Sequence, residues 1–402
     1  MFIDYDYLIN RIQIELKNIL SYWINYTLDN DNEGFVGVVD KNNIRIVEAN
    51  KGIILNTRIL WTFSAAFNFL KQNEFKNYAD RAYEYLIKYF IDNRFGGVFW
   101  LLDFKGYPIN KRKQIYAQAF AIYALSEYYK SNQNDNVLKH AIDIYYLIEQ
   151  HAKDSIYGGY IEAFKEDWTQ IDDYRLSDKD ENLPKSMNTH LHILEAYTNL
   201  YTIWQDKKLE NNIIDLIEIF IEKIFNHNIS HLGLFFTTEW KVMSKIISYG
   251  HDIEASWLVY EAAKVVGVKE LIEKIGVFSL ALAKSVVESI DEYGGLIYEY
   301  NTEKNCFNTD KHWWTQAEAM VGFLNAYELS GKDEWLKRFD FLWNFIEKYI
   351  IDKQHGEWFW RVNKENNPYD ENKVDFWKCP YHNTRACIES IKRLLKIKNY
   401  DN

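Results

Sequence analysis

Glycine-centred turns recur along this chain at a nearly constant interval, and this period restricts the fold more than any other feature. The turns are centred on Gly34, Gly96 and Gly97, Gly158 and Gly159, Gly233, Gly294 and Gly295, and Gly356. Successive turns are 61 or 62 residues apart, except that 74 residues separate Gly159 from Gly233. A fixed period of this kind indicates one supersecondary unit repeated six times.

Helical periodicity fills the intervals between the turns and predicts two helices in each unit. The twelve predicted helices span 4–29, 54–73, 76–93, 113–132, 134–152, 187–206, 209–226, 251–267, 268–289, 313–330, 332–351 and 381–397. In each unit a helix with a polar stripe leads into the glycine turn, and a helix rich in Ala, aromatic residues and His follows it. Polar-stripe helices suit an outer ring and small-residue helices a crowded inner ring. We therefore expect one all-α domain over residues 1–402, with six helix pairs closed into a ring.

Composition and charge exclude several classes of partner. The formal charge is -11 and no run of basic residues is present, which argues against a nucleic-acid partner. The first six residues, Met1 to Asp6, carry acids where a signal peptide carries bases, and we find no uninterrupted apolar stretch long enough to span a bilayer. The chain has only three cysteines, and this small, odd number does not suit a disulfide framework. We expect a cytoplasmic protein that binds no membrane.

Polar and aromatic side chains gather in the first turns of the six predicted inner helices. They are Asn56, Arg58, Tyr116, Gln118, Asn188, His192, His251, Glu254, Trp313, Trp314, Glu318, His382 and Arg385. In a ring with this topology all six helix N-termini point to the same end, and their partial positive charge stabilises a developing anion. One histidine at a helix start is usually a polar cap, but three at matched positions indicate a functional site.

Spacing within these helices suggests side-chain pairs but leaves their roles open. His251 and Glu254 are three residues apart, as are His382 and Arg385, so each pair shares a helix face. Glu254 could hydrogen-bond or tune a histidine, or it could simply stabilise the helix.

Motifs for metals, nucleotides and nucleophiles are missing from the sequence. His190 and His192 are two apart on a predicted helix, so their side chains diverge. Cys379 lies before the last predicted helix, and His382 and Cys387, five apart, lie on different faces of it. There is no CxxC, HExxH, GxxxxGK, GxGxxG or GxSxG motif. We therefore expect no metal. What remains is acid–base chemistry by histidine, or carboxylate-pair chemistry on a sugar, for which the 17% aromatic content is suited.

Six stretches make the sequence resemble the cellobiose 2-epimerases of the N-acylglucosamine 2-epimerase superfamily. They are residues 51–66, 111–129, 187–201, 248–263, 313–328 and 377–389. The resemblance implies an (α/α)6 barrel of twelve helices, with short glycine-initiated hairpins between helices. It also implies an enzyme that isomerises or epimerises sugars at C2 without a metal or redox cofactor.

The resemblance assigns a role to ten residues. His251 and His382 match the acid/base pair. In this pair His382 serves the glucose-type epimer and His251 the mannose-type epimer. His192 matches a third histidine, which helps ring opening. Positions that contact or support the sugar correspond to Arg58, Tyr116, Asp180, Asn188, Glu254, Trp314 and Trp377. The implied substrates are β-1,4-linked disaccharides, with cellobiose converted to glucosyl-mannose and lactose to epilactose, by a monomer or weak homo-oligomer.

Three alternatives stay open at this point. The first is an aldose–ketose isomerase or an N-acylglucosamine 2-epimerase of the same superfamily. The second is a glycoside hydrolase that uses Glu254 and Glu318 as its carboxylate pair. The third is a non-enzymatic solenoid that binds a sugar or a protein.

Overall fold

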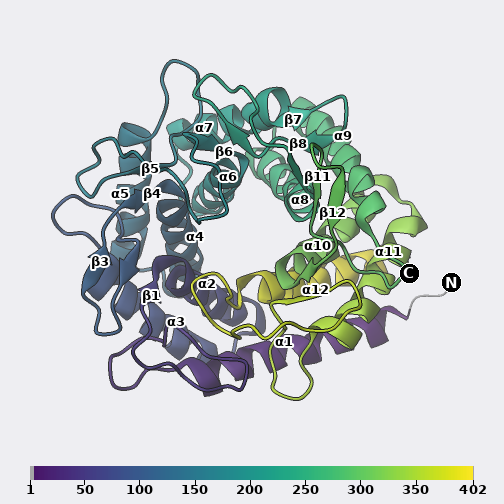
Figure 1. Cartoon of the computed structure of the whole chain (residues 1–402), viewed down its shortest axis with the longest axis horizontal. Coiled ribbons are helices and arrows are strands. Elements are labelled where there is room, and N and C mark those ends of the chain that lie inside the picture. The colour runs from purple at the N-terminus through teal and green to yellow at the C-terminus, as the bar shows by residue number, and fades with distance from the viewer. Residues whose placement is uncertain (1–3, 402) are drawn as a thin grey trace.

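The computed structural model describes residues 4–401, in which twelve α-helices form two concentric rings (Figure 1). The first three residues of the acidic N-terminus, which entered the prediction of no signal peptide, lie outside this range. The inner ring consists of α2 (Ile53–Leu70), α4 (Ile115–Asn132), α6 (Met187–Tyr201), α8 (Tyr249–Val266), α10 (Trp313–Ser330) and α12 (Tyr381–Asp401). The outer ring consists of α1 (Tyr5–Thr27), α3 (Asn73–Tyr85), α5 (Asp135–His151), α7 (Lys207–Ile219), α9 (Lys269–Ser285) and α11 (Asp333–Phe345).

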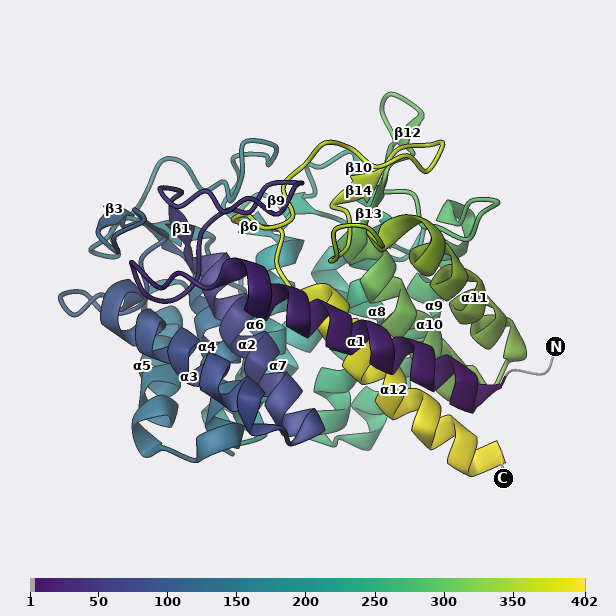
Figure 2. The same ribbon diagram turned by 90° about the horizontal axis from the view of Figure 1, so that it is seen from below.

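Each inner helix packs against the next one in the chain, and α12 packs against α2, so the ring closes. The architecture is an (α/α)6 barrel, which confirms the predicted fold class and the predicted alternation of outer and inner helices. Helices α1 and α12 lie against each other, so the two ends of the chain meet on one side (Figure 2).

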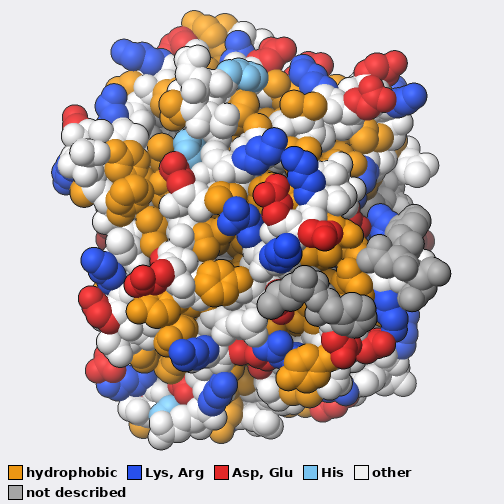
Figure 3. All heavy atoms as spheres, turned by 90° about the vertical axis from the view of Figure 1, so that its right-hand side faces the viewer, with side chains coloured by type: hydrophobic (Ala, Val, Ile, Leu, Met, Phe, Trp, Pro, Cys, Tyr) orange, Lys and Arg blue, Asp and Glu red, His pale blue; other side chains and the backbone are white. Residues whose placement is uncertain are grey.

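Burial separates the two rings as the composition predicts. The inner helix α2 buries 14 of its 18 residues, whereas the outer helix α3 buries four of its 13. An apolar surface on all sides is typical of a helix surrounded by others. Helix α2 is in fact long and apolar enough to cross a bilayer, against the expectation from the sequence, but 78% of it is buried inside the barrel. On the outer face shown in Figure 3, basic and acidic side chains are interspersed.

Short antiparallel strands lie at the end of the barrel where the inner helices begin (Figure 2). They are β1 (Lys51–Gly52), β2 (Leu101–Leu102), β3 (Pro108–Asn110), β4 (Lys113–Gln114), β5 (Ala163–Phe164), β6 (Lys185–Ser186), β7 (Phe225–Asn226), β8 (His231–Leu232), β9 (Phe235–Phe236), β10 (Ile246–Ser248), β11 (Glu299–Asn301), β12 (Cys306–Asn308), β13 (Lys311–His312) and β14 (Arg361–Val362). The sheets are β1-β2-β3, β4-β5, β6-β9, β7-β8, β10-β11-β12 and β13-β14.

These strands join consecutive units. Strands β1, β4, β6, β10 and β13 precede five of the inner helices, and each pairs with a strand that follows the next glycine turn. An isolated bridge between Val39 and Val374 joins the last unit to the first in the same way. The strands therefore fix the starts of neighbouring inner helices relative to one another.

A turn closes an antiparallel bridge behind each outer helix, and five of the six turns contain a glycine; in the fourth, Gly233 follows the bridge and Ser230 has the positive φ, +57°. The bridged pairs are Leu28 with Phe35, Ile91 with Val98, Lys153 with Tyr160, Phe225 with Leu232, Ile290 with Leu296, and Ile351 with Trp358. Gly97 shows why glycine is needed, because its φ is +73° and a Cβ there would lie 2.5 Å from Gln118 Oε1. That oxygen accepts a hydrogen bond from the N–H of Val98 at 2.8 Å. The period in the sequence thus marks the point where each turn approaches an inner helix.

An ion pair with a buried lysine fastens five of the six turns to the segment before the next inner helix. The pairs are Lys51 with Asp29, Lys113 with Asp92, Lys185 with Asp154, Lys311 with Asp291, and Lys373 with Asp352. In the fourth unit the equivalent positions hold Asn226 and Ile247, and a nearby pair, His231 with Asp252, is joined at 2.7 Å. The sequence analysis did not find these pairs, since each spans twenty or more residues.

Candidate active site

Two of the three predicted histidines are held by carboxylates at the end of the barrel where the inner helices begin. His192 on α6 contacts Glu195 Oε2 through Nδ1 at 2.9 Å, and His382 on α12 contacts Glu318 Oε1 through Nδ1 at 2.6 Å. A carboxylate only accepts, so in the neutral imidazole the proton lies on Nδ1 and Nε2 carries the lone pair. Both rings are therefore oriented as bases.

The third histidine, His251 on α8, has a hydroxyl partner instead. Its Nδ1 lies 2.8 Å from Ser248 Oγ. The ring of Trp314 on α10 is centred 4.8 Å from that of His251 and 5.8 Å from that of His382, so one indole contacts both histidines. A Cβ on Gly250 would lie 2.6 Å from the Trp314 ring, which explains the glycine beside His251.

A single buried arginine connects the carboxylates of the site. Arg385 Nη2 donates to Glu254 Oε1 at 2.9 Å and to Glu318 Oε1 at 2.7 Å, while Nη1 donates to Glu195 Oε1 and to the hydroxyl of Tyr381. All four partners come from inner helices, and their side chains are buried. Arg385 thereby links the Nδ1 partners of two histidines through one guanidinium.

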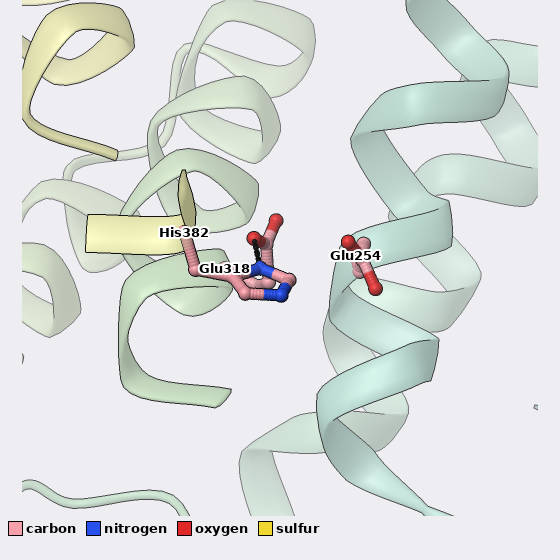
Figure 4. Close-up of side chains that lie close together, drawn as sticks. All are labelled: Glu254, Glu318 and His382. Atoms are coloured by element: carbon pink, nitrogen blue, oxygen red, sulfur yellow. Dashed lines mark hydrogen bonds and ion pairs between the residues drawn. The ribbon is translucent and has the colours of Figure 1, made fainter. Parts of the chain in front are cut away.

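Glu254, Glu318 and His382 form a cluster that deserves comparison with a metal site (Figure 4). One potential ligand atom from each lies within 4.8 Å of the others. However, Arg385 donates to both carboxylates, and His382 Nδ1 is bonded to Glu318. A divalent ion would face this guanidinium at short range in a dry environment, where like charges repel strongly. The contacts therefore favour an arginine-centred network over a metal centre.

A second buried cation stands beside the histidines. Arg58 on α2 donates through Nη2 to the hydroxyl of Tyr116 at 2.8 Å, and its guanidinium lies over the rings of Phe120 and Tyr381 at 4.4 and 5.1 Å. The ring of Tyr116 is in turn centred 4.9 Å from that of His192. A cation with few anionic partners can stabilise negative charge that develops on a substrate.

Burial keeps the three histidines neutral at neutral pH. Burial lowers the pKa of His192. Burial also lowers the pKa of His251, and the charge on a protonated His192 adds to this effect, so that the value is about 3. Burial, with the charges of Arg58 and Arg385, holds the pKa of His382 well below its usual range. Neutral imidazoles with a free Nε2 are proton acceptors, so the site is set up for proton abstraction.

The three carboxylates bonded to Arg385 differ in pKa. Burial acts to raise the pKa of Glu195, but the charge of Arg385 together with the hydrogen bonds from His192 and Tyr381 lowers it to about 2. Burial raises the pKa of Glu254, with the charge of Glu318 adding to the effect, and burial also raises the pKa of Glu318. Glu195 is thus a firmly charged acceptor for the Nδ1–H of His192.

The remaining predicted residues lie around this centre. The Oδ1 of Asn188 is buried and finds no hydrogen-bond partner in the described part of the chain. Asp180 accepts a hydrogen bond from the N–H of Ser177 at 2.9 Å, and it lines a small cavity of about 20 Å³ together with Asn188. The ring of Trp377 is centred 5.9 Å from that of Tyr116. All three therefore belong to the end of the barrel that carries the histidines.

The structure supports neither role suggested for Glu254 on its own helix. Glu254 accepts a hydrogen bond from Arg385, which lies on another helix of the inner ring. His251, three residues before Glu254, contacts the hydroxyl of Ser248 instead. The hypothesis that Glu254 bonds the neighbouring histidine is therefore wrong, because closure of the ring brings a charged partner that a neutral imidazole cannot match.

The predicted divergence of His190 and His192 is confirmed. His190 points away from the site, where its Nδ1 lies 2.6 Å from the Ser186 carbonyl oxygen and its Nε2 accepts from the N–H of Tyr160 at 2.9 Å. His190 thus holds the bridged residue Tyr160 after a glycine turn, as Gln118 on α4 holds Val98.

Four residues of the site were missed in the sequence, namely Glu195, Ser248, Tyr381 and Trp257, whose Nε1 donates to Glu318 Oε2 at 3.1 Å. For Glu195 a signal existed, because it follows His192 by three residues, the spacing that drew attention to Glu254. The others carry no pattern that distinguishes them from ordinary helix residues.

A cavity of about 400 Å³ opens at the opposite end of the barrel, among the C-terminal halves of the inner helices. Its ionisable side chains are paired, Glu127 with Lys130 and Glu261 with Arg393. Glu195 and Trp257 of the site reach its lining, but no histidine does, so we assign the chemistry to the other end.

Comparison with known proteins identifies the family. The family model for N-acylglucosamine 2-epimerase matches residues 34–386. A protein named cellobiose 2-epimerase from Bacteroides fragilis is 45% identical over 95% of this chain and 98% of its own length, and one from Dictyoglomus turgidum is 42% identical over 94% and 96%. The solved structure of cellobiose 2-epimerase from Bacillus thermoamylovorans superposes with a TM-score of 0.93 at 38% identity, over 96% of this chain and all of that one.

An (α/α)6 barrel with neutral histidines at one end fits proton chemistry on a sugar, and the comparisons define its class. The chain belongs to the N-acylglucosamine 2-epimerase family. The protein is a carbohydrate epimerase.

Proposed function

We propose that the protein inverts C2 of the reducing-end glucose of β-1,4-linked disaccharides, converting cellobiose to glucosyl-mannose and lactose to epilactose. Two lines of support meet in this proposal. Relatives that are 45% and 42% identical over nearly the whole chain are named cellobiose 2-epimerases. The site offers neutral histidines and two buried arginines, which suit proton transfer through an anionic intermediate.

The chemistry requires two proton carriers. The C2 proton becomes acidic only in the open aldehyde, so ring opening precedes its removal. One base then takes the proton and leaves an enediolate, and a proton delivered to the opposite face inverts C2. His251 and His382 start different inner helices and both contact Trp314, so they are suited to act on the two faces. A positioned acid or base contributes about 10²–10⁴-fold to such a step.

Four further residues have roles in this scheme. His192, with Nδ1 held by Glu195, presents Nε2 for the proton transfer that opens the ring. Arg58 supplies positive charge for the enediolate oxygens. Trp314 and Trp377 offer aromatic faces to the sugar.

The contacts of the carboxylates disfavour a glycoside hydrolase. A hydrolase needs two carboxyl groups on either side of the glycosidic bond. Here Glu254 and Glu318 both bind the same nitrogen of Arg385, so the space between them is taken by the guanidinium.

The single observation that carries the proposal is that all three histidines are held through Nδ1, His192 and His382 by a carboxylate and His251 by a hydroxyl, so that Nε2 is the nitrogen left for proton transfer. Cellobiose is incubated with the protein in deuterated water, and the products are identified by NMR. We expect glucosyl-mannose with its linkage intact and deuterium at C2. His251→Asn and His382→Asn should each nearly abolish inversion, while His355→Asn, at the surface far from the site, should not.

Several outcomes would contradict the proposal. Free glucose as the product would indicate the hydrolase, and a ketose as the main product would indicate the isomerase. Retention of the original C2 hydrogen through inversion, or full activity of both histidine variants, would refute the two-base scheme.

A further inference from the structure

We propose that Ser248 is a positioning residue that holds the imidazole ring of His251 in place for proton transfer. This inference rests on the proposed function and adds to it a residue through which one of the two faces is controlled. It is carried by the contacts of Ser248, which differ from those of a serine in the same place on a neighbouring helix.

Ser248 occupies the N-cap position of α8 but does not cap the helix with its side chain. Serine is favoured at N-caps because its oxygen accepts from a free N–H of the first turn. Ser186 does this at the start of α6, where its Oγ accepts from the N–H of Thr189 at 3.1 Å. In Ser248 the oxygen lies 2.8 Å from His251 Nδ1 instead. The helix thus gives up a capping bond, and the histidine gains a partner.

The backbone holds the hydroxyl in place. Ser248 is the last residue of β10, paired with Glu299 of β11, and its side chain is 2% exposed. Its hydroxyl can accept from Nδ1–H or donate to a bare Nδ1, so in either tautomer the bond holds the ring through Nδ1 and leaves Nε2 as the other nitrogen for proton transfer.

His251 differs from the other two histidines in the charge of its Nδ1 partner. His192 and His382 have carboxylates on Nδ1, whereas His251 has a hydroxyl. A hydroxyl holds the ring and adds no charge beside it, so the role left for Ser248 is to position His251.

The test follows exchange of the C2 hydrogen from each epimer separately. Cellobiose and glucosyl-mannose, each deuterated at C2, are incubated with the protein in ordinary water, and loss of deuterium is measured along with inversion. In Ser248→Ala, exchange from the mannose-type epimer should slow about tenfold, since a ring without its hydrogen bond leaves the orientation needed for proton transfer. Exchange from the glucose-type epimer should change little, and net inversion should slow in both directions with KM nearly unchanged.

Two variants separate positioning from stability. Ser248→Thr keeps the hydroxyl and should restore most of the exchange. Ser186→Ala removes a true cap, so it should lower the thermal transition more than Ser248→Ala does, while its exchange rates stay even between the two epimers.

Each outcome bears on the inference. If Ser248→Ala exchanges both epimers like the unaltered protein, or slows both equally, Ser248 does not position His251. If His251→Asn itself inverts C2 at a normal rate, the proposed base pair fails first. Selective loss with rescue by threonine would establish the role.

Discussion

Removal of the positive charge of Arg385 tests the network under the three histidines. The variant Arg385→Met keeps the length of the side chain but leaves Glu195, Glu254 and Glu318 without the guanidinium to which all three are bonded. Those three carboxylates are 1–5% exposed, so water cannot replace the lost donor.

The expected loss is large compared with the stability of a typical domain. Breaking a buried ion pair by removing one partner costs about 3–5 kcal/mol, and a whole domain is stable by about 5–15 kcal/mol. Burial raises the pKa of Glu254 and Glu318 even with Arg385 in place, and removal of the Arg385 charge raises both values further. A carboxyl group whose pKa is raised in the folded state weakens stability as pH rises above its unfolded value. The deficit should therefore be larger at pH 8 than at pH 5.

Urea unfolding of both proteins at pH 5 and pH 8 measures this deficit. Arg385→Lys keeps the charge but cannot reach all partners at once, so we expect a smaller loss of stability and a large loss of turnover. Arg393→Met is the matched control, because this buried arginine also holds two glutamates but lies away from the histidines. It should lower stability and leave turnover intact. A deficit below about 1 kcal/mol at pH 8, or one that does not change with pH, would refute the reasoning.

Three further predictions concern the turns and the aromatic residues. Lys113→Ile leaves the buried Asp92 without its ion-pair partner, with only the backbone N–H groups of Arg94 and Phe95 as donors, and should cost about 3–5 kcal/mol. Adding Asp92→Asn should recover most of this loss, as the neutral fourth unit suggests; additive losses in a double-mutant cycle would count against it. Burial acts to lower the pKa of His231, but its bond to Asp252 raises it on balance, so the stabilisation is complete below pH 6.5 and lost as pH rises through the folded value. Between pH 6 and pH 9 the thermal transition temperature of His231→Gln should accordingly fall less than that of the unaltered protein. Trp377→Ala should weaken turnover far more than it lowers the thermal transition, and a collapse of folding alone would favour a purely structural role.

The fold was largely predictable because its signals are local or periodic. Most of the glycines mark turns where the backbone passes close to an inner helix, as at Gly97, whose positive φ and close approach to Gln118 favour glycine. Burial on every side fixes the composition of the inner helices, and amphipathicity fixes that of the outer ones. The expected ring of twelve helices follows from these patterns.

The site was predictable only in part. Because all inner helices begin at one end, the sequence places His192, His251 and His382 together without further information. It does not choose their partners, since the same spacing of three residues pairs His192 with Glu195 and His251 with Glu254.

Only ring closure decides between these pairs. His382 meets Glu318 from 64 positions away, and Glu254 meets Arg385 from 131 positions away. The physical reason is that a buried carboxylate binds the strongest donor within reach, and which donor lies within reach depends on how six helices pack around a common axis. The sequence by itself thus determines the rings and the end that carries the histidines, and the tertiary structure determines which group holds each proton.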